Sequence, residues 1–219
     1  MKKNSGLLIL LVSLLAACSI ETTRKVKIEI PSVPEIRLDR SQEIIVTNFW
    51  QDKEIQDFGL NQDLVQYFQD ELKRPFKGKL STKTISWDNA DLPKNKDFWK
   101  QAAGDAKNTL FLTGKVQFGQ ELRKALLANE KRAVDDGPFA KERAWAERRN
   151  YSLKIEIFLI QSDTGDVLFQ REYQEQMNYA NIKQSAEFAF FDLIQRIKPK
   201  LFRALFGTDK VQERYLLSK

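Results

Sequence analysis

Cys18 is the only cysteine of the chain, so no internal disulfide can hold the fold together. Histidine is absent altogether, which removes the commonest zinc ligand and the usual general base near neutral pH. Ser-His and Cys-His catalytic systems are excluded for the same reason. The chain must therefore be stabilised by an apolar core, and its 219 residues are enough for one domain of ordinary size.

The segment before Cys18 has the three parts of a secretory signal: Lys2 and Lys3, an apolar stretch over 7–15, and small residues before the cut. The stretch is too short to span a bilayer, which needs roughly 20 apolar residues. Leu15-Ala16-Ala17-Cys18 resembles the bacterial lipoprotein signal, which implies cleavage between Ala17 and Cys18 and a lipid such as palmitate on the Cys18 sulfur. An ordinary signal peptide with an incidental cysteine is the alternative.

The lipid sets the expected location of the protein. Each buried acyl methylene contributes roughly 0.8 kcal/mol, so several chains on one residue hold a protein on a membrane. By resemblance to the sorting rule of enteric bacteria, Ser19 after the cysteine favours the outer membrane. We therefore expect a domain in the periplasm, anchored to the outer membrane, with no cofactor other than the covalent lipid on Cys18.

The charge pattern excludes further classes. The formal net charge of +6 falls by two when Lys2 and Lys3 leave with the signal, and the remaining charges of both signs are interleaved. A nucleic-acid footprint needs a clustered patch of one sign, so we expect no nucleic-acid partner. Asp135-Asp136 is a candidate acidic pair, but it precedes Gly137-Pro138 and indicates a solvated turn, because catalytic carboxylates normally converge across a cleft. We expect no enzyme and no metal site.

Composition and patterning divide the chain into a signal peptide (1–17), a lipid-anchored tether (18–42), an α/β domain (43–207) and a C-terminal tail (208–219). Within the tether, Val26, Ile28 and Ile30 alternate with charged residues, which predicts a short edge strand.

The domain itself shows alternating strand and helix patterns. Strands are predicted over 43–50, 82–87 and 109–118, and a hairpin over 151–161 and 167–173 with its turn at 162–166. Helices are predicted from an Asn61 N-cap to Pro75, over 96–106, and from a Ser185 cap onward, with a kink or restart at Pro199. This order defines an α/β class with a mixed sheet and helices packed on it. The basic amphipathic segment 200–206 either completes the core or dips into a membrane surface.

Residues 119–150 form a charged insertion that is longer than a hairpin turn requires. One interpretation is a solvated helical excursion with turns near Gly137-Pro138. The other is a partner-binding or membrane-facing insertion. Its candidate contacts are two aromatic residues with arginine neighbours, which are typical interface anchors: Phe139, Arg143, Trp145 and Arg148.

Three segments carry a resemblance to a known family. EIIVTNFW from Glu43, LFLTGKVQFG from Leu110 and IEIFLIQSDTGDVLFQ from Ile155 are similar, in order and spacing, to strands of the TolB N-terminal-like group of bacterial lipoproteins (CsgG-, PelC- and LpoB-like proteins). The resemblance implies that group's fold and a non-catalytic scaffolding role in the cell envelope, often as homo-oligomeric rings.

Three functions follow as hypotheses. The first is a non-catalytic, lipid-anchored accessory component of envelope assembly or export, which acts through contacts with envelope proteins. The second is an activator of a peptidoglycan synthase; it would need a long tether, and about 20 residues at about 3.5 Å each reach about 70 Å. The third is an envelope glycan hydrolase, which would need converging acids with perturbed pKa values.

Overall fold

The computed structural model describes residues 23–38, 41–53, 55, 57–104, 106–128 and 143–217, and these divide into two compact units. In the smaller unit, β1 (Thr23–Ser32) pairs antiparallel with β8 (Thr208–Leu217). β1 contains the alternating residues of the expected edge strand. Its partner β8 lies in the segment that the sequence pattern indicated as a tail.

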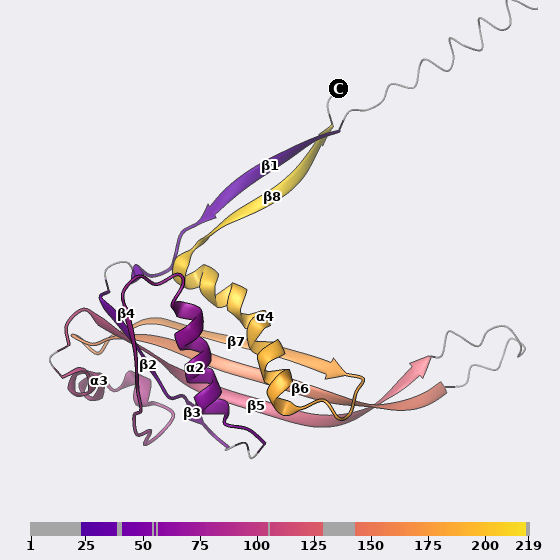
Figure 1. Cartoon of the computed structure of the whole chain (residues 1–219), viewed down its shortest axis with the longest axis horizontal. Helices are drawn as coiled ribbons and strands as arrows, with labels where there is room; N and C mark the ends of the chain where they lie inside the picture. Colours follow the sequence, from indigo (N-terminus) through magenta and orange to yellow (C-terminus); the bar gives the residue numbers. More distant parts are fainter. Residues whose placement is uncertain are drawn as a thin grey trace, which may run out of the picture. The chain divides into compact units, whose positions relative to one another are not determined.

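The larger unit, Val33–Gly207, is built on a mixed sheet. β2 (Glu43–Thr47) lies parallel to β4 (Lys79–Lys83) on one side and to β5 (Thr109–Ala128) on the other. β6 (Arg143–Gln161) and β7 (Val167–Tyr179) follow antiparallel, and the short β3 (Trp50–Gln51) also pairs with β5 (Figure 1). The sheet confirms the predicted fold class.

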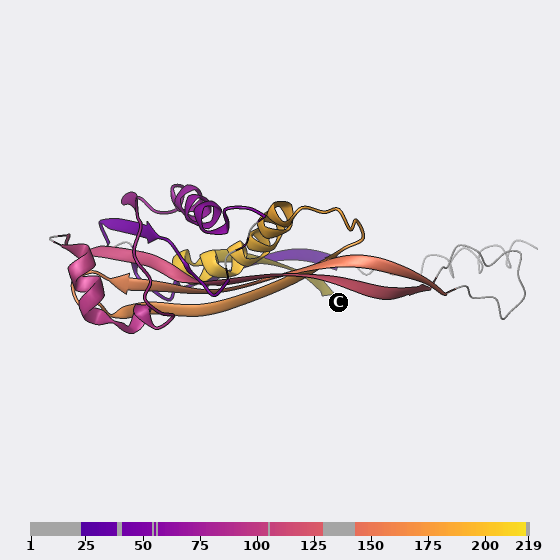
Figure 2. The same ribbon diagram turned by 90° about the horizontal axis from the view of Figure 1, so that it is seen from below.

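The two faces of the sheet carry two separate cores. α2 (Leu60–Leu72) and α4 (Ala186–Phe206) cover one face, as Figure 2 shows with the sheet seen on edge. Their apolar stripes pack on alternate strand residues such as Ile44, Leu112 and Ile157, which are at most 1% exposed. At one end of the opposite face, the 3-10 turn η2 (Leu92–Lys94) and α3 (Lys96–Ala103) close a smaller core around Trp99.

Local chemistry explains several element boundaries. Ser185 caps α4 as predicted, because its Oγ accepts a hydrogen bond from Phe188 N at 3.3 Å. The predicted Asn61 cap is wrong, because α2 begins at Leu60. The Asn61 side-chain amide instead forms hydrogen bonds with the backbone of Phe49, just before β3. Its Oδ1 accepts from Phe49 N at 2.7 Å, and its Nδ2 donates to Phe49 O at 2.6 Å.

Of the predicted kink or restart at Pro199, the restart is wrong, since α4 continues across it to Phe206. Pro199 removes one backbone donor, but Pro199 and Gln195 are both exposed, so the freed carbonyl can face water. The segment 200–206 completes the core, because Leu201 and Leu205 are each 1% exposed. The fourth strand lies at Lys79–Lys83, upstream of the predicted 82–87.

The largest correction concerns the predicted insertion. β5 runs on to Ala128 and β6 begins at Arg143, so 119–128 and 143–150 are strand rather than a helical excursion. The register pairs them continuously from Gly119 opposite Ser152 to Ala128 opposite Arg143. The sequence pattern did not reveal these strand extensions, because their many charged residues break the alternation by which a half-buried strand is recognised. Within the described ranges, no helix combines the length and apolar character needed to cross a membrane.

Candidate interaction surface

The exposed side of α4 begins with two phenylalanines. The buried stripe of this helix runs through Phe190, Ile194 and Ile197, but Phe188 is 54% and Phe191 37% exposed. Ile182, in the turn before the helix, is 40% exposed. We call these three residues, Ile182, Phe188 and Phe191, the α4 patch.

Neighbouring contacts hold the patch in place. The Phe188 ring meets the Tyr179 ring edge-on, with centroids 6.2 Å apart, and the Phe191 ring lies 5.2 Å from the buried ring of Phe190. The Tyr179 hydroxyl donates to Asp192 Oδ2 at 2.6 Å. Burial and this hydrogen bond to the carboxylate raise the pKa of Tyr179. Its hydroxyl therefore stays protonated, and the side chain beside Phe188 is uncharged.

A further exposed apolar side chain lies in register with Tyr179. Leu122 of β5 is 53% exposed and pairs with Arg149 of β6, which in turn pairs with Tyr179 of β7. A strand and a capped helix thus present Leu122, Phe188 and Phe191, which favours binding because little ordering of these side chains is needed.

Beyond Arg149, β5 and β6 continue as a two-stranded arm (Figure 1). The sequence candidates fall at this end. Arg148 pairs with Arg123 in the arm, and the backbones of Trp145 and Arg143 pair with Leu126 and Ala128. Phe139 lies outside the described residues, as do the side chains of Arg143 and Trp145.

Other sequence candidates also fall outside the described ranges: the cleavage site Ala17 and Cys18, and the acidic pair Asp135-Asp136. Among the described residues there is no group of three or more acidic, histidine or cysteine side chains that could hold a metal ion.

Beyond the smaller core, the face of the sheet opposite α4 carries polar side chains that pair with one another. Lys115 contacts Glu156 at 3.0 Å, Gln170 donates to Glu156 at 2.7 Å, and Lys154 contacts Glu172 at 3.0 Å. Burial would raise the pKa of Glu156, but the hydrogen bonds from Gln170 and Lys115 outweigh it and the pKa is lowered. A carboxylate held ionised in this way cannot act as a general acid near neutral pH.

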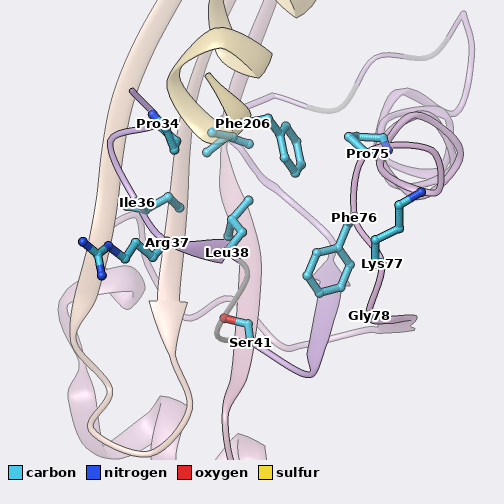
Figure 3. A pocket seen from close by; sticks show the side chains of 11 residues that line it. Pro34, Ile36, Arg37, Leu38, Ser41, Pro75, Phe76, Lys77, Gly78 and Phe206 are labelled. Atoms are coloured by element: carbon cyan, nitrogen blue, oxygen red, sulfur yellow. The ribbon is translucent and has the colours of Figure 1, made fainter. Parts of the chain in front are cut away.

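An open pocket of about 500 Å³ lies between residues 34–38 with Ser41, the loop 75–78 after α2, and the end of α4 (Figure 3). Leu38, Phe76 and Phe206 come from three segments and form its apolar wall, whereas the charged ends of Arg37 and Lys77 extend away at the sides. Its described lining is largely apolar, so the pocket offers apolar contact.

The sequence reasoning missed the α4 patch, although a signal was present. Phe188 and Phe191 fall outside the stripe of Phe190, Ile194 and Ile197. Large apolar residues on the solvent side of an amphipathic helix are a recognisable sign of a binding surface.

The fold and its surface define a mixed α/β domain with an exposed aromatic patch and a two-stranded arm. No family model and no curated protein matches the chain. Among solved structures, the chain is similar to the PelC dodecamer from Paraburkholderia phytofirmans, with 11% identity, a TM-score of 0.43, and coverage of 84% of this chain and 99% of that one.

Two further solved structures show the same level of likeness. A putative neuraminyllactose-binding hemagglutinin homolog from Helicobacter pylori has 11% identity and a TM-score of 0.40, and the match covers 81% of this chain and 90% of that chain. A lipoprotein from Neisseria meningitidis has 9% identity and a TM-score of 0.37, over 73% of this chain and 96% of that one. At these values the likenesses assign no residue of this chain a role.

Proposed function

We propose that the chain is a non-catalytic lipoprotein, anchored to the bacterial outer membrane through Cys18, with its α/β domain in the periplasm. In this proposal it serves envelope assembly or export as an accessory component and acts through contacts with envelope proteins. The observation that carries the proposal is the α4 patch, in which the chain leaves two phenylalanines exposed side by side on one helix.

Two sequence features support the same proposal. Without histidine, and with a single cysteine in the lipoprotein-like signal, the chain offers few residues for catalysis. A surface built from aromatic side chains instead suits protein recognition, where phenylalanine and arginine are enriched. Confinement to a membrane surface would raise the effective concentration of the α4 patch near a membrane-bound partner, so that a weak contact suffices.

The anchor is tested by replacing Cys18 with serine in the full chain. We expect the variant to move from the membrane to the soluble fraction, because the acyl chains have no other site of attachment, with the thermal unfolding of the domain unchanged. Fractionation and circular dichroism measure the two. A variant that stays wholly in the membrane fraction refutes the proposed lipid attachment.

The patch is tested by the double substitution Phe188→Ser and Phe191→Ser. Both side chains are exposed, so we expect the midpoint of thermal unfolding to change by only a few degrees, while contact with the partner is lost. A photo-reactive amino acid at position 188 measures contact in living cells, with the same probe at Gln195, exposed two turns further along α4, as the control.

A discrete cross-linked species at position 188 that is absent at position 195 supports the proposal. Equal cross-linking at both positions, or none at either, contradicts it. A large loss of stability in the double variant would show instead that the two phenylalanines belong to the core.

A further inference from the structure

The outer edge of β7 is a second surface of interest, because its backbone N–H and C=O groups on that side pair with no strand in the described residues. β7 has 13 residues and stands at the end of the strand order, with β6 as its one strand neighbour in the described part of the unit 33–207. Every second backbone N–H and C=O of an edge strand points away from its sheet, and such an edge is a template for another strand.

The two edges of the sheet differ in length and in composition. β4 has five residues and begins and ends with Lys79 and Lys83, a usual protection against edge pairing. β7 contains neither lysine nor proline. It is also held rigidly, because Phe169 and Tyr173 are 5% and 8% exposed in the core beneath α4.

The sequence of β7 is complementary to itself when it is reversed. If two copies meet antiparallel with Tyr173 opposite Tyr173, Arg171 of each copy lies opposite Glu175 of the other. The remaining pairs carry no like charges: Phe169 with Met177, Gln170 with Gln176, Glu172 with Gln174, Leu168 with Asn178, and Val167 with Tyr179. Opposite charges directly across two strands stabilise their pairing.

Other registers lack this match. Centring the pair on Arg171, Glu172 or Glu175 places two like charges directly opposite each other, and centring it on Gln174 leaves Arg171 opposite Met177. A shift by a single residue would bring the helix-covered side of one strand against the polar side of the other. Among the registers that keep matching sides together, only the one centred on Tyr173 forms two opposite-charge pairs.

From this we infer that β7 is the interface of a two-fold symmetric dimer, in which the sheets of two copies of the chain join through their β7 edges. The two matching pairs would also join existing ion pairs, since Arg171 contacts Glu35 at 2.8 Å and Glu175 contacts Lys200. Charges of alternating sign would then run from Glu35 of one copy to Lys200 of the second. The inference goes beyond the proposed function and does not depend on it.

Disulfide trapping in membranes that contain the full chain tests the register. A mixture of the single variants Glu172→Cys and Gln174→Cys places two thiols directly opposite, at a Cα separation of about 5 Å that a disulfide can span. A mixture of Gln170→Cys and Glu172→Cys is the control: these residues lie on the same exposed side of β7, but four residues out of register, about 13 Å apart.

We expect a cross-linked dimer in the first mixture and little in the control. Equal cross-linking in both mixtures, or none in the first, overturns the inference.

Charge reversal tests the same pairs independently. Arg171→Glu and Glu175→Arg should each weaken dimerisation of the detergent-solubilised full chain by about tenfold or more, because like charges then face each other twice. The double variant, which restores opposite charges, should recover most of the affinity. Circular dichroism checks that each variant is folded, and a double variant that dimerises no better than the single variants contradicts the proposed register.

Discussion

Replacing Trp99 with alanine is expected to lower the free energy of unfolding by about 3–5 kcal/mol, among the largest effects of any single change in this domain. The Trp99 side chain is fully buried and fills the centre of the smaller core, where its ring lies 5.1 Å from that of Phe111. Its Nε1 donates to Leu92 O at 3.0 Å, so the substitution also removes one of the two hydrogen bonds that this carbonyl accepts, the other coming from Asn95 N. Chemical denaturation measures the loss.

Phe98→Ala is the matched control for this substitution, because Phe98 precedes Trp99 in α3. The two rings contact each other edge to face, with their centroids 5.2 Å apart. Phe98 is only partly buried, so we expect a loss of about 1 kcal/mol. Equal losses in the two variants would show that α3 is not anchored through Trp99.

The second large effect is expected at Gly114 of β5, which pairs with Ile157 of β6. A Cβ atom at this position would lie 2.3 Å from Glu156 O and 2.5 Å from a carbon of the Phe49 ring. The first neighbour is backbone of the central strand β6 and the second is a buried ring, so neither can move aside cheaply. We expect Gly114→Val to destabilise the domain by about 3 kcal/mol or more, and Gly114→Ala by about 1–3 kcal/mol.

Gly119 lies five residues further along the same strand and serves as the control. A Cβ atom there would meet the Ser152 Oγ at 2.7 Å, and a serine hydroxyl can rotate away. Gly119→Ala should therefore change the free energy of unfolding by less than about 1 kcal/mol. The change should be an increase, because alanine lowers the conformational entropy of the unfolded chain. Similar losses at both positions in thermal or urea unfolding would contradict the packing of Phe49 over Gly114.

The sequence predicted the central strands because their patterns have one clear period. Leu153, Ile155, Ile157 and Leu159 alternate and are all fully buried beneath the helices, as the alternation requires. The turn after Gln161 is predictable from Gly165, whose φ of 71° belongs to the conformation that glycine adopts most readily. These features depend on neighbours close in sequence.

Features that depend on distant partners were not predictable in the same way. Asn61 resembles a helix cap in sequence, but the backbone of Phe49 occupies its amide. The strand β8 has meaning only through its pairing with β1, which lies almost the whole chain away. The register of β5 and β6 beyond Gly119 likewise follows from the pairing already established nearer the core, and not from any apolar pattern of its own.

The candidate surface likewise has one part that was predictable from local sequence and one part that depends on tertiary packing. The helix that carries Phe188 was predicted, with its cap, from its own period and Ser185. How much of each phenylalanine ring would remain exposed depended on how α4 meets the sheet, since Phe190 is buried while Phe191 beside it is 37% exposed. The helical phase alone could have marked both exposed rings, had they been compared with the stripe.

The central claim, a lipid-anchored protein of the cell envelope, is tested most directly by the intact mass of the chain after extraction from membranes with detergent. The account predicts a chain that begins at Cys18 and carries the added mass of acyl groups on that residue. A membrane-extracted chain that still begins at Met1, or one that begins at Cys18 without acyl groups, would contradict it.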